Sequence, residues 1–136
     1  MIEFAFVVIL LIALVYGIVS LGLSLAAKAT ITQAAADGAR AGIVAPSSTA
    51  AATAIAQASQ DLSWMGKGAC NSANITCTAG IANCSSDSPT GPFYQCLTVK
   101  VLYNYALSPL FPPMPGIGIL DPSSISSTSS LQMSTN

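Results

Sequence analysis

FAFVVILLIALVYGIVSLGLSLAA, residues 4–27, is an apolar run of 24 residues that contains no charged side chain. It begins after Glu3 and ends before Lys28. A helix rises ~1.5 Å per residue, so this run reaches ~36 Å, more than the ~30 Å of a bilayer's hydrocarbon core. We therefore expect a helix that is buried in lipid, among other copies of itself, or in each in turn.

The helical pattern continues beyond Lys28 and ends near Pro46, which disfavours helical geometry at the residue before it. Asp37 and Arg40 are three residues apart and are expected to pair on the polar side of this continuation. The opposite side carries a stripe of small apolar residues: Ile31, Ala34, Ala35, Gly38, Ala39 and Gly42. The sequence thus predicts one long helix from Met1 to about Val44.

A secretory signal peptide fits this N-terminus badly. No basic residue precedes the run, and the run is longer than the 7–15 residues of a signal peptide's apolar region. The helical pattern also continues past Lys28 without an A-x-A cleavage site. We expect a chain whose start is already processed and whose apolar helix is retained.

Composition excludes several classes of function. Apolar residues make up 52% of the 136 residues and charged residues only 7%, against about 25% in ordinary soluble domains. Four basic residues give no basic patch for nucleic acid, and the absence of histidine removes the commonest general base and metal ligand. The acidic residues are scattered singly: Glu3, Asp37, Asp61, Asp87 and Asp121. We therefore predict a protein that is not an enzyme and that binds no cofactor, metal or nucleic acid.

Four cysteines lie in the polar part of the chain: Cys70, Cys77, Cys84 and Cys96. Their spacing lacks the C-x₂₋₄-C pairs of zinc sites, so we favour two disulfides over zinc or free thiols. A small extracellular domain with a thin core gains stability from such bonds. Three pairings are possible, and the spacing does not choose among them.

The remaining segments predict an α+β fold. A second helix is expected over 49–62 with Ser47 or Ser48 as its N-cap, then a disulfide-stapled loop over 67–92 with short strands at most. Strands are expected over 93–107 and 123–134, separated by a Pro-rich connector. The fold class is a lollipop-like long helix (1–45) followed by a small domain (46–136) in which a short helix packs on a small antiparallel sheet.

Two groups of residues in the first helix are candidates for assembly. A charge in the apolar interior costs about 2.5–3.5 kcal/mol, so Glu3 needs a partner there, and the α-amino group of Met1 is the obvious cation. Between staggered copies this contact would set the register; the alternative is that Glu3 lies among lipid headgroups. Small residues suit close helix packing, although glycine is also common in membrane helices: Gly17, Ser20, Gly22 and Ser24.

The N-terminal residues resemble those of TadE-like pilins, in the tight-adherence branch of the type IV pilin superfamily. The resemblance rests on Ile2-Glu3-Phe4-Ala5-Phe6-Val7, on Gly17-Ile18-Val19 with Gly22, and on the Ala/Gly-rich segment over 31–41. The Val99-Lys100-Val101 strand, the Pro-rich connector and the Ser-rich last strand occur in a similar order. Type IV pilins carry their glutamate at the fifth mature position, whereas here it is the third residue.

The resemblance implies a structural subunit that polymerises through its N-terminal helix into an extracellular Tad-like type IV pilus for adhesion and surface attachment. Its partners would be other copies of itself, the cytoplasmic membrane before assembly, a prepilin peptidase and the pilus assembly machinery. Two alternatives stay open. The chain is a minor pilin or pseudopilin that primes another filament, or a single-pass membrane protein that displays a small binding domain.

Overall fold

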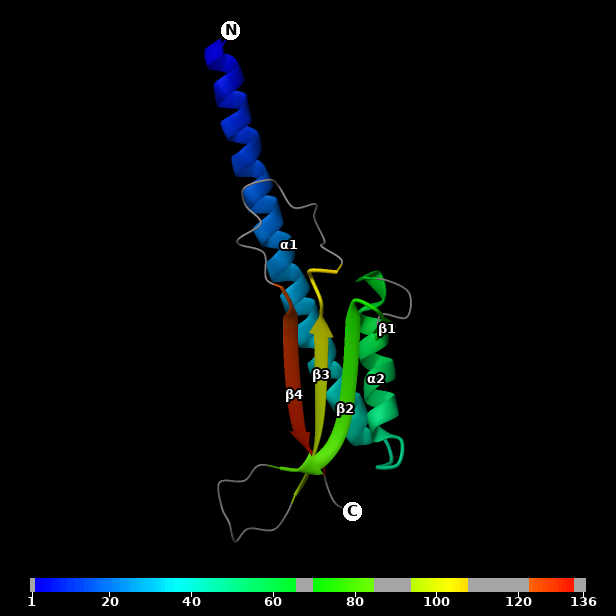
Figure 1. Cartoon of the computed structure of the whole chain (residues 1–136). Coiled ribbons are helices and arrows are strands. Elements are labelled where there is room, and N and C mark those ends of the chain that lie inside the picture. The colour runs from blue at the N-terminus through cyan, green and yellow to red at the C-terminus, as the bar shows by residue number, and fades with distance from the viewer. Residues whose placement is uncertain (1, 66–69, 85–93, 108–122, 134–136) are drawn as a thin grey trace.

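The computed structural model describes residues 2–65, 70–84, 94–107 and 123–133. A long helix and a shorter one precede an antiparallel sheet (Figure 1). The elements are α1 (Ile2–Val44), α2 (Ala50–Asp61), the 3₁₀ turn η1 (Ser63–Met65), β1 (Asn71–Ser72), β2 (Ile75–Asn83), β3 (Gln95–Tyr103) and β4 (Ile125–Gln132). The predicted fold class is confirmed.

Helix α1 ends at Val44, two residues before Pro46, as the sequence predicts. Three of its hydroxyl side chains donate to the carbonyl oxygen four residues earlier, and the helix continues through all three. These bonds run from Ser24 to Ser20 (3.0 Å), from Thr30 to Ala26 (3.0 Å) and from Thr32 to Lys28 (2.9 Å). The hydroxyl of Ser24 therefore has a partner even in an apolar environment.

The start of α2 differs from the prediction. The helix begins at Ala50 and its N-cap position is Thr49, so the predicted caps Ser47 and Ser48 are wrong. The hydroxyl of Thr49 donates to the carbonyl oxygen of Pro46 at 3.2 Å and makes no capping bond to the helix. The tight turn between Pro46 and Thr49, closed by a 2.9 Å backbone hydrogen bond, moves the helix start.

The sheet has the strand order β1-β2-β3-β4, with every neighbouring pair antiparallel. In β3, Val99 pairs with Ala79 of β2 on one side and with Ser129 of β4 on the other. The inward residues of β3 are buried as predicted: Leu97, Val99, Val101 and Tyr103, with Tyr105 following the strand. In β4, Ile125 and Met133 mark the inward parity, also as predicted.

Strand β2 corrects the expectation of a loop over 67–92. It spans nine residues and pairs with β3 along its whole length. Its inward positions Ile75, Cys77 and Ala79 alternate with exposed Thr76 and Thr78. Cysteine and alanine give a weak hydrophobic alternation, and the strand becomes clear only when it pairs with β3.

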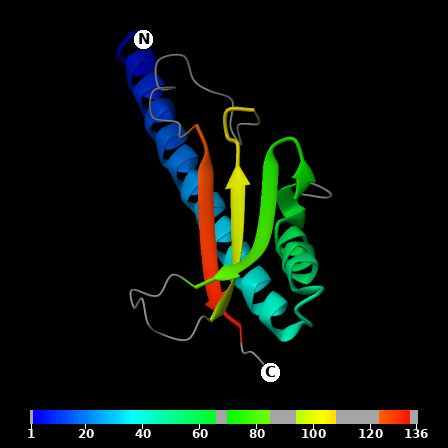
Figure 2. The same ribbon diagram turned by 60° about the horizontal axis from the view of Figure 1, so that its bottom comes forward.

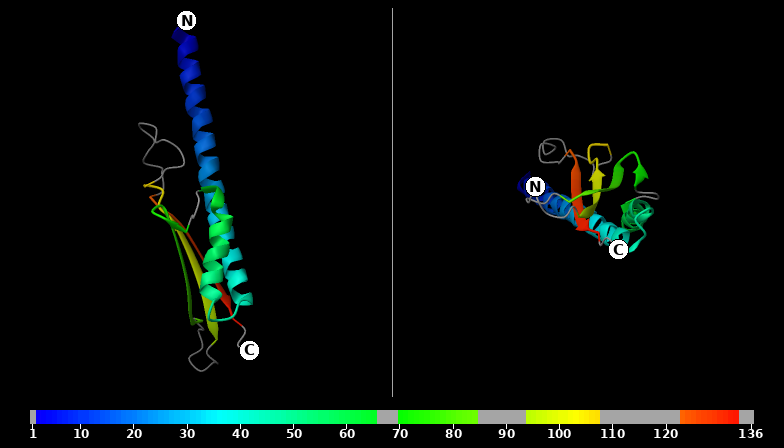
Figure 3. Two further views of the ribbon diagram at one scale, coloured as in Figure 1. Left: turned by 90° about the vertical axis from the view of Figure 1, so that its right-hand side faces the viewer. Right: turned by 90° about the horizontal axis from the view of Figure 1, so that it is seen from below.

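The domain has two layers, with both helices on one face of the sheet (Figures 2 and 3). The C-terminal half of α1 packs on β3 and β4, and α2 packs on β2 while running beside α1. The other sheet face is half-buried or exposed and carries hydroxyl groups: Thr76, Thr78, Thr98, Ser126, Thr128 and Ser130. Thr98 and Ser130 share a hydrogen bond of 3.0 Å across β3 and β4.

The two helices meet through a seam of small residues. All six residues of the predicted apolar stripe of α1 are buried. Its two glycines, Gly38 and Gly42, lie against three alanines of α2: Ala50, Ala54 and Ala58. A Cβ atom at Gly38 would lie 2.7 Å from the carbonyl oxygen of Ala54, closer than real Cβ contacts allow. Glycine is therefore required at this approach of the helices.

Trp64 corrects a further expectation. The sequence predicts that Trp64 and Met65 pack over the small core. Met65 packs against the core cluster, but Trp64 is 56% exposed in η1.

Candidate functional site

The N-terminal segment, defined here as residues 3–26 of α1, projects beyond the sheet and α2 (Figures 1 and 3). No residue of this segment is buried. Its large exposed side chains are Phe4, Phe6, Val7, Ile9, Leu10, Leu11, Ile12, Leu14, Val15, Ile18, Val19, Leu21, Leu23 and Leu25. Phe4 is 75% exposed and Leu25, at the other end, is 69% exposed.

Such a surface is unstable in water. Each large side chain of the N-terminal segment would gain about 1.5–3 kcal/mol on complete burial. Soluble monomers rarely expose contiguous apolar patches above a few hundred Å². This surface therefore needs lipid or other apolar helices around it.

Length and composition also permit a membrane span. Within the described residues, α1 is the one helix long and apolar enough to cross a bilayer, and its most apolar window has no buried residue. Core helices of soluble proteins pass the same length test but are mostly buried. The N-terminal segment differs from them because none of its residues is buried.

Packing changes abruptly within α1. Ala27 is the first fully buried residue, and Ile31, Ala34 and Ala35 follow as part of the core. The polar side of this half holds the predicted ion pair, in which Arg40 Nη1 lies 3.1 Å from Asp37 Oδ1. One continuous helix thus carries an exposed apolar half and a half that is built into the domain.

The predicted assembly pair lies at the free end of this helix. Glu3 is exposed and lies in the first turn, where a carboxylate interacts favourably with the helix dipole. Met1 lies outside the described residues. The contact between Glu3 of one copy and the amine of another remains a prediction.

The predicted helix-packing residues also have open space around them. A Cβ atom at Gly17 or Gly22 would have no neighbouring atom within 4 Å apart from its own helix. Ser20 and Ser24 are half-buried, and the hydroxyl of Ser24 donates its proton to the backbone carbonyl oxygen of Ser20. In the single chain no other element packs on Gly17 or Gly22, so another helix has room to approach there. The role of the four small residues in helix packing stays a prediction.

The four cysteines form two disulfides, Cys70–Cys77 and Cys84–Cys96. The first closes the hairpin of β1 and β2, and the second links the end of β2 to β3. The backbone N–H of Cys84 also donates to the carbonyl oxygen of Tyr94 at 2.8 Å. Each cysteine is thus bonded to its neighbour along the chain, a pairing that the sequence leaves open. The two disulfides hold β2 near both of its ends.

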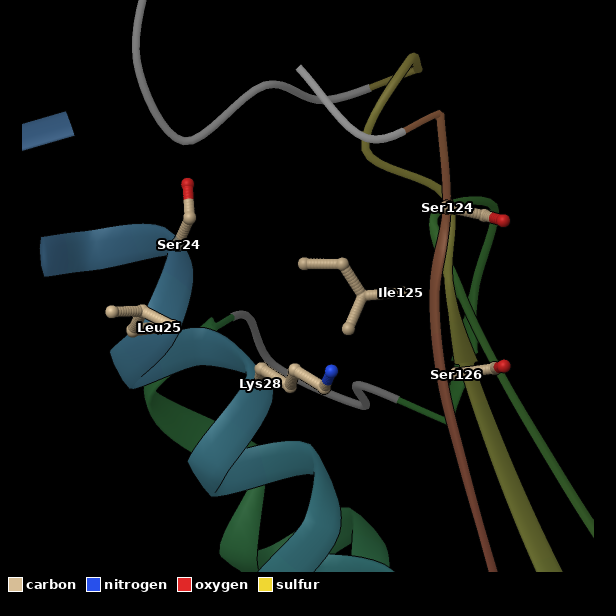
Figure 4. A pocket seen from close by; sticks show the side chains of 6 residues that line it. All are labelled: Ser24, Leu25, Lys28, Ser124, Ile125 and Ser126. Carbon is tan, nitrogen blue, oxygen red and sulfur yellow. The ribbon is translucent and has the colours of Figure 1, made fainter. Parts of the chain in front are cut away.

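A hollow of about 400 Å³ lies where the N-terminal segment leaves the domain (Figure 4). Ser24, Leu25 and Lys28 line it from α1, and Ser124, Ile125 and Ser126 line it from the start of β4. Sequence reasoning missed this hollow, because residues 24–28 and 124–126 meet only through the packing of α1 on β4. The one feature of the sequence that points to this place is Lys28, the charged residue that ends the apolar run.

In the described part of the chain, no group of three or more histidine, cysteine, aspartate or glutamate residues is placed to hold a metal ion. The described acidic residues stay apart, with Glu3 at the start of α1, Asp37 paired to Arg40 and Asp61 at the end of α2. The exposed apolar surface of the N-terminal segment is therefore the candidate functional site.

Comparison with protein families finds a match to the family described as TadE-like protein, over residues 1–40. The N-terminal helix is therefore similar to members of this family. This match confirms the resemblance that the N-terminal residues predict. Neither the curated proteins nor the solved structures provide a match.

The TadE-like match covers both functional halves of α1. It includes the N-terminal segment with Glu3 and also the buried stripe up to Ala39. It ends before α2 and the sheet.

Proposed function

We propose that this chain is the structural subunit of a Tad-like type IV pilus, a homopolymer held together by the N-terminal segment. The single observation that carries the proposal is the continuity of α1. Its exposed apolar half is joined without a break to a half that is fully built into a disulfide-linked domain. A rigid connection of this kind transmits the position of the helix directly to the domain.

The proposed subunit has two environments. Before assembly the N-terminal segment lies in the cytoplasmic membrane, with the domain outside. In the filament it lies among the N-terminal segments of other copies, and the domains coat the outside of the bacterial cell-surface fibre. The hydroxyl-bearing sheet face, which no described helix covers, suits exposure to water.

Transfer from lipid to filament needs a driving force other than hydrophobicity. Lipid tails are as apolar as neighbouring helices, so close packing and polar contacts decide the balance. The open positions at Gly17 and Gly22 allow close approach, and pairing of Glu3 with the Met1 amine of another copy supplies the polar contact. Membrane extraction and processing in this scheme are the work of the pilus assembly machinery and a prepilin peptidase.

Stoichiometry in purified filaments tests this function. Filaments sheared from cells of the source bacterium should contain this chain as the dominant protein, and deletion of its gene should remove them. N-terminal sequencing of the filament protein should find Met1 as the first residue, with a free α-amino group, followed by Ile2 and Glu3. Adhesion of the cells to a surface should fall in the same deletion strain.

Three other outcomes have distinct meanings. A few copies per filament would identify a minor pilin or pseudopilin. Filaments that persist in the deletion strain, with this chain confined to the membrane fraction, would identify a membrane-anchored binding protein. Either result contradicts the proposed homopolymer, as would a chain found only in the cytosol.

A further inference from the structure

The hollow between α1 and β4 has walls of two kinds (Figure 4). Ile125 reaches into it from β4, and Lys28 extends towards it from α1 with its ammonium group near Ile125. The side chains of Ser124 and Ser126 point away from it. The hollow is therefore an apolar recess with one positive charge at its side.

The charge of Lys28 has no acidic partner among the described residues. The one ion pair in that part of the chain joins Arg40 to Asp37, which lie more than two helical turns further along α1. Lys28 is exposed, so its ammonium group is hydrated in the isolated chain and available to an anion. An anionic group that also brings apolar atoms would match both walls.

The position of the hollow selects the kind of anion. The apolar run ends at Ala27, and Lys28 is the next residue. When the N-terminal segment spans a bilayer, Lys28 lies at the level of the lipid headgroups on the side of the domain. The recess is continuous with the lipid-facing surface of the helix through Leu25, which is 69% exposed.

We propose that this hollow binds the headgroup of an anionic phospholipid, such as phosphatidylglycerol, while the chain is stored in the membrane. The lipid phosphate pairs with the ammonium group of Lys28. The glycerol backbone lies against Ile125, and the acyl chains follow the N-terminal segment. This inference rests on the membrane stage of the proposed function and identifies the lipid class that holds the domain against the bilayer.

Lipid retention by the full chain tests the site. The chain is reconstituted in nanodiscs of phosphatidylcholine mixed equally with phosphatidylglycerol, released into mild detergent, and examined by native mass spectrometry. We expect the wild-type chain to retain phosphatidylglycerol in preference to phosphatidylcholine. Lys28→Gln should reduce that preference about fivefold, which corresponds to about 1 kcal/mol for one lysine near an anionic surface.

Lys100→Gln is the matched control. Lys100 is an exposed lysine in β3, on the sheet face that no described helix covers, and its loss removes the same charge away from the hollow. We expect Lys100→Gln to retain phosphatidylglycerol like the wild type. Ser126→Ala changes a side chain that points away from the hollow and should also retain phosphatidylglycerol like the wild type.

Several results would overturn the proposal. Equal losses in Lys28→Gln and Lys100→Gln would indicate non-specific attraction, and displacement of the lipid by inorganic phosphate at constant ionic strength would indicate a site for free anions. Unchanged retention in Lys28→Gln, with a lower melting temperature, would assign Lys28 to a carboxylate of the chain itself. None of these results bears on filament stoichiometry, so the failure of this site and the failure of the proposed function are distinguishable.

Discussion

Gly38 sits at a close approach of α1 to α2, and its missing side chain is a packing requirement. A Cβ atom there meets the backbone of Ala54, which has no flexible end that moves aside. At Gly42, one turn further along, a Cβ atom would lie 2.9 Å from the carbonyl oxygen of Ala50. Gly22 belongs to the same helix but has open space, so the same residue type has a different role there.

We expect Gly38→Ala to lower the free energy of unfolding of the domain by a net of up to about 2 kcal/mol. The clash with Ala54 costs about 1–3 kcal/mol, and the better helix propensity of alanine returns about 1 kcal/mol. Gly22→Ala is the control and should leave the domain unchanged or slightly more stable. Differential scanning calorimetry of the full chain in mild detergent measures both, and equal melting temperatures would show that the seam yields without cost.

Glu3 acts at the other end of the same helix. We expect Glu3→Gln to abolish or strongly reduce filaments while the chain still accumulates in the membrane, because a neutral side chain has no charge to pair with the amine of another copy. Asp37→Asn removes a carboxylate that already pairs within its own helix and should keep filaments. Electron microscopy and shearing yields compare the two, and abundant filaments in Glu3→Gln would remove Glu3 from the assembly mechanism.

At the scale of elements, β3 organises the domain. It lies between β2 and β4, and its inward side chains reach both core clusters below the helices. The alternation of β3 is strong enough to read from the sequence because valine, leucine and tyrosine carry it. The neighbouring strand β2 cannot be predicted from the sequence, because cysteine, alanine and glycine give it only a weak hydrophobic alternation. The sequence also does not determine which cysteines form the disulfides that hold β2 in place.

Two leucines of β3 test this assignment of faces. Leu97 is fully buried, and we expect Leu97→Ala to lower the free energy of unfolding by about 2–5 kcal/mol through lost burial and a residual cavity. Leu102, on the other face, is 36% exposed, so Leu102→Ala should cost well under half as much. Thermal unfolding of both variants in the same detergent compares the two losses of stability. Equal losses in the free energy of unfolding would contradict the register of β3.

At the scale of the whole molecule, α1 belongs to two structures at once. The predicted division into 1–45 and 46–136 follows the end of a helix, whereas burial begins at Ala27, in the middle of that helix. The domain needs the C-terminal half of α1 to cover β3 and β4. The N-terminal segment contributes no buried residue and serves contacts outside the single chain.

Removal of residues 1–26 should therefore give a soluble, folded monomer, because every described core residue lies from Ala27 onward. The full chain at the same concentration should require detergent. Light scattering after size-exclusion chromatography measures the mass, and circular dichroism measures the retained helix. An aggregated or unfolded product would show that the N-terminal segment stabilises the domain.

The sequence by itself determined the long helix, its apolar half, the small-residue stripe, the strand β3 and the parity of β4, because each rests on a period within one segment. It also indicated two disulfides and the TadE-like N-terminus. Only the tertiary structure decided the disulfide pairing, the strand β2, the exposure of Trp64, the fit of Gly38 against Ala54 and the hollow beside Lys28. Each of these depends on residues far apart in the chain that meet when α1, α2 and the sheet pack together, and no local period encodes such a meeting.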